Sequence, residues 1–112
     1  MSLSRLLLAL FALCSFLPTT SPAQMVWTCV TDSAQWEARF GHQLVVFHDT
    51  MWLFGGSGSG RRSLNDIWYS TDGDSWICAT PLAQWSPRSS PRPFVFDDKL
   101  WLTGGFFWNG SY

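Results

Sequence analysis

The segment Trp52-Leu53-Phe54-Gly55-Gly56 returns 49 residues later as Trp101-Leu102-Thr103-Gly104-Gly105. The match extends toward the N-terminus without a gap, and fourteen of the thirty positions from 27 to 56 are identical to those from 76 to 105. Self-similarity at a period near 50 residues is the signature of a protein built from repeated structural units. The identities include residue types that seldom coincide through composition alone, at Trp27 and Trp76, Cys29 and Cys78, and Arg39 and Arg88.

Within one period the sequence predicts four short β-strands separated by turns. These strands are expected at Gln43–Phe47, Met51–Phe54, Asp66–Ser70 and Ser75–Thr80. The pair Asp72-Gly73 is typical of a tight hairpin turn, and the Gly-, Ser- and Pro-rich stretches 57–65 and 81–93 are expected to be loops. Further strands are expected at Phe94–Phe96 and Lys99–Thr103, which repeat the first two, and at Met25–Thr31, which matches a fourth strand.

The predicted strands are apolar on both faces, since Leu44-Val45-Val46-Phe47 does not alternate between apolar and polar residues. A strand of this kind is expected to be buried on both sides. One four-stranded sheet cannot cover both of its own faces, so it must stack against similar sheets. Antiparallel four-stranded sheets that stack in this way are the blades of a β-propeller. The sequence therefore predicts an all-β fold made of propeller blades.

The repeat resembles the Kelch repeat, which is about 50 residues long. The residues that carry the resemblance are Arg39, Val45-Val46-Phe47, Asp49, Gly55-Gly56, Leu64-Asn65-Asp66-Ile67-Trp68 and Trp76. A second, partial copy has Arg88, Val95-Phe96, Asp98 and Gly104-Gly105, but Ser90-Pro91 replaces Gly41-His42. The resemblance implies a galactose-oxidase/Kelch-type β-propeller, of which residues 24–112 would form an incomplete part. One full blade is expected at about 43–80 and half a blade at about 93–105.

Propellers consist of four to eight blades. We therefore expect the 112 residues to be part of a longer protein, in which missing blades complete the ring. The alternative is a small protein that closes the ring by self-association. In either case residues 24–112 are not expected to form a stable monomer, because repeat units generally need several neighbours.

Residues 1–23 are predicted to be a secretory signal peptide. Arg5 provides the positive charge, Leu6–Leu17 is an apolar stretch, and Ser21-Pro22-Ala23 places small residues before a cleavage site. The apolar stretch is shorter than the ~20 residues that a membrane-spanning helix needs, although a retained anchor is an alternative. The mature chain is thus expected to be secreted and extracellular, or periplasmic in a bacterium, with no membrane association after cleavage.

The composition excludes several classes of protein. Aromatic residues make up 17% of the chain and charged residues 13%, which is too apolar for an intrinsically disordered protein. Seven Lys and Arg residues against eight Asp and Glu residues give a net charge of −1, so no positive field favours nucleic acid. Three cysteines, an odd number, do not make a disulfide framework.

Few residues suggest catalytic or metal chemistry. Cys29 and Cys78 occupy equivalent positions of two repeats, too far apart for a disulfide, and are expected to be buried free thiols unless a partner lies elsewhere. The two histidines have no neighbouring ligand residues in the sequence, so no zinc site is expected. The hairpin Ser70–Trp76 is similar to the Asp-box of sialidase-type propellers, but its aspartates are too few for calcium. We expect no cofactor, no metal and no catalytic residue in this segment.

Ligand contacts are expected on loops, because rigid strands position the loops that bind. The candidate contact residues are Arg61, Arg62, Trp85, Arg88 and Arg92. The two adjacent arginines could hold the carboxylate of an acidic peptide or sugar, and a merely solvated pair is the plainer alternative. Because arginine recurs at Arg39 and Arg88, a structural ion pair or backbone contact is expected there. Asn109-Gly110-Ser111 fits an N-glycosylation acceptor or a plain turn.

Two classes of function remain. The first is a secreted, non-catalytic Kelch-repeat module that binds a protein or a glycan. The alternative is a fragment of a propeller enzyme that acts on carbohydrate, either as an oxidase or in sialic-acid chemistry. Such an enzyme would take its catalytic residues from other blades, and fold alone does not decide between the two classes.

Overall fold

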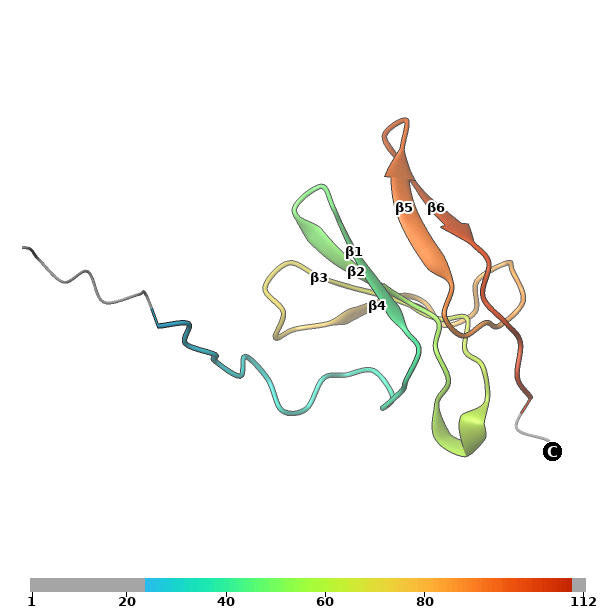
Figure 1. Ribbon diagram of the computed structural model, residues 1–112, viewed down its shortest axis with the longest axis horizontal. Coiled ribbons are helices and arrows are strands. Elements are labelled where there is room, and N and C mark those ends of the chain that lie inside the picture. Colours follow the sequence, from blue (N-terminus) through green and yellow to red (C-terminus); the bar gives the residue numbers. More distant parts are fainter. Residues whose placement is uncertain (1–23, 110–112) are drawn as a thin grey trace, which may run out of the picture.

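The computed structural model describes residues 24–109, so the predicted signal peptide, residues 1–23, lies outside the described residues. The described chain is all-β, as the sequence predicts. Strands β1 (Gln43–Phe47), β2 (Thr50–Phe54), β3 (Ile67–Ser70) and β4 (Ile77–Thr80) form one antiparallel sheet in the order β1-β2-β3-β4 (Figure 1). Strands β5 (Arg92–Phe96) and β6 (Lys99–Thr103) form a separate two-stranded hairpin. One short 3₁₀ turn, η2 (Ser59–Arg61), lies in the loop between β2 and β3.

The strands lie where the sequence predicts them, with two exceptions. The segment 25–31 was expected to be a strand but has no strand structure, because no strand among residues 24–109 pairs with it. Pro93 was assigned to a loop but lies inside β5, opposite Leu102 of β6. Proline is tolerated there because β5 pairs on one side only, so no ladder hydrogen bond needs its missing N–H.

The β1–β2 hairpin and the β5–β6 hairpin have the same backbone geometry, 49 positions apart. Their two-residue turns, His48-Asp49 and Asp97-Asp98, have positive φ angles of 49°, 55°, 50° and 53°. Two consecutive positive φ angles define the turn that best matches the twist of a two-stranded ribbon, and Asp tolerates this conformation. The two turns also contact each other, since His48 Nε2 lies 2.7 Å from Asp98 Oδ1.

The strand register assigns the side chains of the sheet to two faces, because residues that pair across antiparallel strands share a face. One face, here called the covered face, carries Val45, Phe47, Trp52, Phe54, Ile67 and Tyr69. The other, here called the open face, carries Leu44, Val46, Met51, Leu53 and Trp68. Strand β5 lies beside β1 (Figure 1), and Leu100 and Leu102 of β6 lie across a hollow of about 310 Å³ from Trp52 and Phe54.

The core is small and lies where β2 meets the loops. Its buried apolar residues are Leu53, Phe54, Leu64 and Trp76. Trp76 packs edge-on against Trp36, with ring centroids 6.0 Å apart. The expectation that β1 is buried on both sides is wrong for Leu44 and Val46, which are 52% and 65% exposed. The hairpin covers only one face of the sheet. On the other face Leu44 and Val46 remain in contact with solvent, whereas Leu53 is fully buried.

Gly55 shows why a glycine pair follows β2. Its φ is +59°, and a Cβ atom built there would lie 2.5 Å from the backbone oxygen of Arg88. The chain can therefore pass close to the loop before β5 only because this residue has no side chain. At Gly104, the counterpart in the second hairpin, φ is +66°, but apart from its chain neighbours no heavy atom of residues 24–109 lies within 4 Å of such a Cβ.

The hairpin between β3 and β4 is held by short polar side chains. Asp72 Oδ1 accepts hydrogen bonds from the backbone N–H groups of Asp74 and Ser75, both at 2.9 Å. Ser70 Oγ accepts from the N–H of Gly73 at 2.8 Å, and Trp76 Nε1 donates to the Gly73 carbonyl. These hydrogen bonds lower the pKa of Asp72, chiefly through the N–H groups of Ser75 and Asp74. The Asp-box-like segment is therefore a structural turn.

Cys29 and Cys78 are free, as predicted, but they are not buried as expected. Cys29 is exposed and Cys78 is partly exposed. Cys29 lies in the segment that forms no strand, so no neighbouring strand covers it.

Candidate functional site

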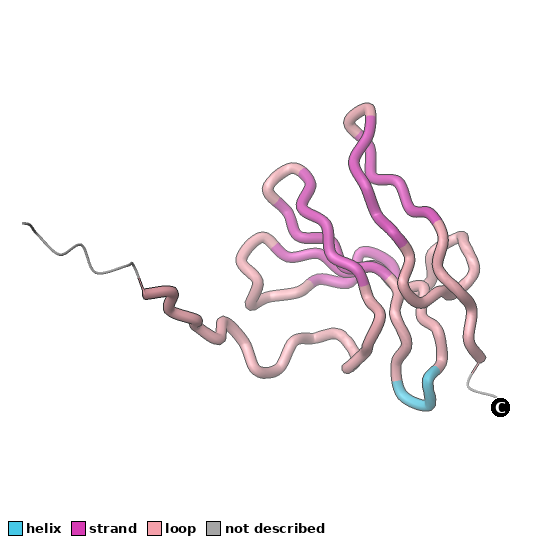
Figure 2. Tube along the Cα trace, viewed as in Figure 1, coloured by secondary structure: helices cyan, strands magenta, loops and turns pink. Residues whose placement is uncertain are grey.

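Four segments that are distant in the sequence meet at the loop end of the molecule, opposite the two hairpin turns (Figure 2). These segments are 37–41, 57–65, 81–91 and 106–109. Backbone hydrogen bonds join them: Gly56 N–H donates to the Arg88 carbonyl, Arg88 N–H donates to the Leu64 carbonyl, and Ser63 N–H donates to the Trp108 carbonyl. Ser57 Oγ and Ser89 Oγ, both buried, also form a hydrogen bond. The loop end is therefore held in one conformation by its own backbone.

Arg39 is the central polar residue of this end. Its two terminal nitrogens contact the two carboxylate oxygens of Asp66 at 2.6 and 2.8 Å, and one of them also donates to the Gly55 carbonyl. The Arg39 side chain has no exposed surface and that of Asp66 is 16% exposed. Burial raises the pKa of Asp66, but the hydrogen bonds from Arg39 and Trp68 and the charge of Arg39 together lower it by more. The pKa of Asp66 therefore lies below its ordinary value of 3.8. The expected structural ion pair at Arg39 is thus confirmed.

Arg88 repeats half of this arrangement. It donates to the Gly104 carbonyl at 2.8 Å, as Arg39 does to Gly55, and its Nε donates to the Ser86 carbonyl, as that of Arg39 does to Glu37. The second terminal nitrogen of Arg88 donates to Ser86 Oγ in place of a carboxylate. The backbone contact expected at Arg88 is confirmed.

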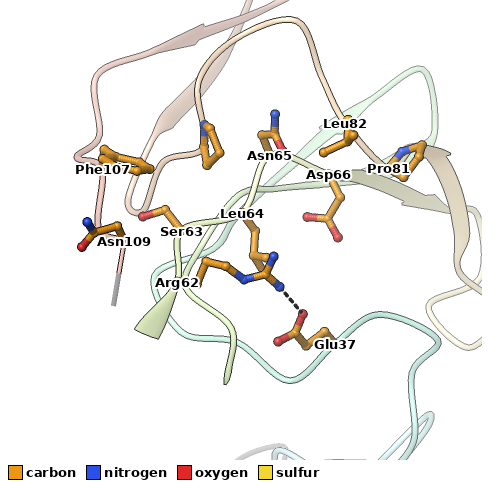
Figure 3. Close-up of a pocket in the computed structure, with 11 residues that line it drawn as sticks. Glu37, Arg62, Ser63, Leu64, Asn65, Asp66, Pro81, Leu82, Phe107 and Asn109 are labelled. Atoms are coloured by element: carbon orange, nitrogen blue, oxygen red, sulfur yellow. Dashed lines mark ion pairs between the residues drawn. The ribbon is translucent and has the colours of Figure 1, made fainter. Parts of the chain in front are cut away.

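The first hollow at the loop end has a volume of about 460 Å³ (Figure 3). Its lining residues include Glu37, Arg62, Asn65, Asp66, Leu82, Phe107 and Asn109. Asn65 Nδ2 donates to the carbonyls of Ala83 and Trp85, and Asp66 is paired with Arg39. The amide of Asn65 and the carboxylate of Asp66 therefore serve to hold the loops together.

The remaining charged pair of the first hollow is loose. Arg62 lies 3.7 Å from Glu37, and both side chains are partly exposed (Figure 3). The backbone N–H of Ser59 donates to Glu37 Oε1 at 2.7 Å, and this bond is the main cause of the lowered pKa of Glu37. An exposed pair of this length contributes about 0–1 kcal/mol to stability.

The second hollow, of about 440 Å³, is mainly aromatic. It is lined by Phe40, Ser57, Arg61, Phe106 and Trp108. The rings of Phe40 and Phe106 are more than half exposed. Among residues 24–109 the polar residues that line this hollow are Arg61 and Ser57, and Ser57 is hydrogen-bonded to Ser89. A hollow with aromatic walls and a cation at its rim suits an apolar group that carries a nearby negative charge.

A ribbon formed by residues 61–63 and 106–109 contributes residues to both hollows. Arg62 and Asn109 are bridge partners in this ribbon. Alternate residues of extended segments point to opposite sides. Accordingly Phe107 and Asn109 line the first hollow, whereas Phe106 and Trp108 line the second. Arg62 also lines the first hollow, and Arg61, which ends the 3₁₀ turn with a φ of 59°, lines the second. The structure thus separates the two arginines that the sequence suggested as a pair.

The other candidate contact residues lie elsewhere. Trp85 lines the hollow between the sheet and the β5–β6 hairpin, and Arg88 belongs to the loop network described above. Arg92 is exposed at the start of β5 and lines neither hollow. Asn109 lines the first hollow, while the rest of its glycosylation motif, residues 110–111, lies outside the described residues. Sequence reasoning missed Phe40, Phe106 and Trp108, although the aromatic run from 106 to 108 was a visible signal.

Among residues 24–109 no group of three or more His, Cys, Asp or Glu side chains could hold a metal ion. No helix in this range is long and apolar enough to cross a membrane.

Neither a scan against protein-family models nor a search of curated proteins finds a match to this chain.

Proposed function

We propose that this chain is a secreted Kelch-type β-propeller segment that acts as a non-catalytic binding module for a protein ligand. The internal repeat and the four-stranded antiparallel sheet support the propeller part of the proposal. The observation that carries the binding part is the aromatic hollow at the loop end, with Arg61 at its rim.

The chemistry of the hollow favours a peptide segment over a sugar. Sugars carry many hydroxyl groups, so a sugar site needs several polar side chains that are available to the ligand. The amide and carboxylate of Asn65 and Asp66 are committed to the loops, and they line the other hollow. The second hollow offers apolar walls formed by Phe40, Phe106 and Trp108. It therefore suits an aromatic or aliphatic side chain of a partner, with a neighbouring Asp or Glu beside Arg61.

The test is a selection of random linear peptides against the purified protein, followed by binding measurements on the best peptide. We expect selected peptides to combine an apolar residue with an acidic one. Arg61→Glu and Phe106→Ser should each weaken binding by about tenfold or more, or ~1.4 kcal/mol. Fluorescence anisotropy of the labelled peptide measures this loss.

The ribbon supplies matched controls, because the neighbouring residues point the other way. Arg62→Glu and Phe107→Ser carry the same chemical changes into the first hollow and should leave peptide binding unaltered. Equal losses in both pairs of variants would contradict the proposal. So would a failure to select any peptide combined with binding of an acidic oligosaccharide from a glycan array, which would instead assign the site to a glycan.

A further inference from the structure

We propose that the chain binds a second copy of itself, head to tail, through two exposed apolar faces that repeat its internal packing. One is the open face of the sheet, represented by Leu44 and Val46. The other is the outer face of the β5–β6 hairpin, represented by Phe94 and Phe96. This inference concerns the strand faces and does not depend on the loop-end site.

The outer face of the hairpin is the counterpart of a face that is covered in the sheet. Phe94, Phe96 and Trp101 stand 49 positions after Val45, Phe47 and Trp52. Those three residues are less exposed because the β5–β6 hairpin lies against their face. In the hairpin itself, Phe94 and Phe96 are 43% and 66% exposed, whereas Trp101, which is 45% exposed, also lines the hollow toward the sheet. Among residues 24–109 the same set of apolar residue types thus occurs in two hairpins, and a neighbouring hairpin covers it in one of them.

The open face of the sheet is the counterpart of the hairpin face that does the covering. Leu44, Met51 and Leu53 precede Pro93, Leu100 and Leu102 by 49 positions. Leu100 and Leu102 line the hollow between the hairpin and the sheet, opposite Trp52 and Phe54.

Each uncovered face therefore corresponds to one half of an interface that already exists within the chain. In the proposed contact, the outer face of the hairpin of one copy takes the place that the covered face of β1 and β2 has within a chain. The open face of the sheet of the second copy takes the place of the hairpin that covers them. A contact of this kind joins two different surfaces. Such a heterologous contact leaves one face of each type free at the ends, so it continues into a ring or a filament. Exposed Trp, Phe and Val side chains make the association favourable through the apolar area that they bury.

Two substitutions break one face each without touching the other. Val46→Asp places a charge on the open face of the sheet, and Phe96→Asp places one on the outer face of the hairpin. Both side chains are about two-thirds exposed, so neither change removes a core residue. We expect the unmodified protein to form concentration-dependent multimers by size-exclusion chromatography with light scattering. Each variant alone should have the molar mass of a single chain.

The decisive measurement is a mixture of the two variants. The Val46→Asp chain retains an intact hairpin face and the Phe96→Asp chain retains an intact sheet face. Head-to-tail association therefore predicts a one-to-one dimer that grows no further. The dimer also shows that both variants are folded. Leu82→Asp is the control, because Leu82 is an apolar loop residue that is even more exposed, at 76%; this variant should form multimers like the unmodified protein.

Three outcomes would overturn the proposal. The first is an unmodified protein that stays monomeric at all concentrations. The second is a single variant that still associates with itself, which would indicate a symmetric contact or pairing of strand edges. The third is a mixture of two monomeric variants that does not dimerise although circular dichroism shows both to be folded. Val46→Lys in place of Val46→Asp repeats the test if the first variant does not fold.

Discussion

The β1–β2 hairpin and the β5–β6 hairpin are built from similar sequences and have the same turns, yet their residues experience different surroundings. Leu53 of β2 is fully buried, whereas its counterpart Leu102 of β6 is only partly buried. β2 pairs with strands on both sides, and β6 pairs with β5 alone. The comparison separates what a local sequence specifies, namely strands and turns, from what its neighbours supply, namely burial and ion pairing.

The largest expected difference between the two units concerns their arginines. Arg39→Ala leaves the carboxylate of Asp66 without its partner in a mostly buried position, and such a loss costs about 3 kcal/mol or more. Arg88→Ala removes exposed hydrogen bonds to Gly104 and Ser86 and should cost less than about 1 kcal/mol. Urea unfolding at a fixed protein concentration measures both. Equal costs for the two variants would show that the second unit is as well ordered as the first.

The glycine pairs provide the next contrast. Gly55→Ala must push a methyl group against the Arg88 carbonyl and also adopt a positive φ, so a loss of about 2–4 kcal/mol is expected. In Gly104→Ala the added methyl group has no atom of residues 24–109 within 4 Å apart from its chain neighbours. Only its positive φ should lower the free energy of unfolding, by about 1–2 kcal/mol. The midpoint of thermal or urea unfolding distinguishes the two. If Gly104→Ala proves as destabilising as Gly55→Ala, a further part of the protein must pack against Gly104.

The smallest effect is the response to acid. Because the pKa of Asp66 is lowered in the folded state, its stabilising contribution is complete above the ordinary value of 3.8 and is lost as pH falls through the folded-state pKa. The urea midpoint should therefore be flat from neutral pH to about pH 5 and decline below about pH 4.

Asp66→Asn is the matched variant for the acid response. It removes the titrating group, so its urea midpoint should fall less steeply in acid than that of the unmodified protein. The hairpin has no carboxylate paired with Arg88 among residues 24–109, so Arg88→Ala should leave the acid response unchanged. An equally steep acid decline in Asp66→Asn would assign the response to other carboxylates, such as Glu37.

Much of the fold was predictable because its signals are local. The apolar strands, the Asp-containing turns and the glycine pair after β2 each follow from a few consecutive residues. The two errors in strand assignment have a common cause. The segment 25–31 has the residues of a strand but no partner, and Pro93 lies in a strand because one of its sides needs no hydrogen bond. Pairing is not visible in a single stretch of sequence.

The candidate site was less predictable for a related reason. Arg61 and Arg62 are adjacent in the sequence, and adjacency suggested a joint role. Arg61 ends a 3₁₀ turn with a φ of 59°, whereas Arg62 is extended and forms a bridge with Asn109, and the two residues line different hollows. Phe40 and Phe106 line one hollow although 66 positions separate them, and no local pattern connects such residues.

The period of 49, the all-β character, the position of each turn and the structural role of Arg39 could be read from the amino-acid sequence alone. These features depend on backbone conformation and on residue types that favour it, and both are set by residues that are neighbours in the chain. Three properties became known from the folded chain: which copy of each repeated residue is buried, which arginine has a carboxylate partner, and which aromatic rings share a hollow. Those properties arise from contacts between distant segments, and the same residue at two equivalent positions can therefore have two different environments.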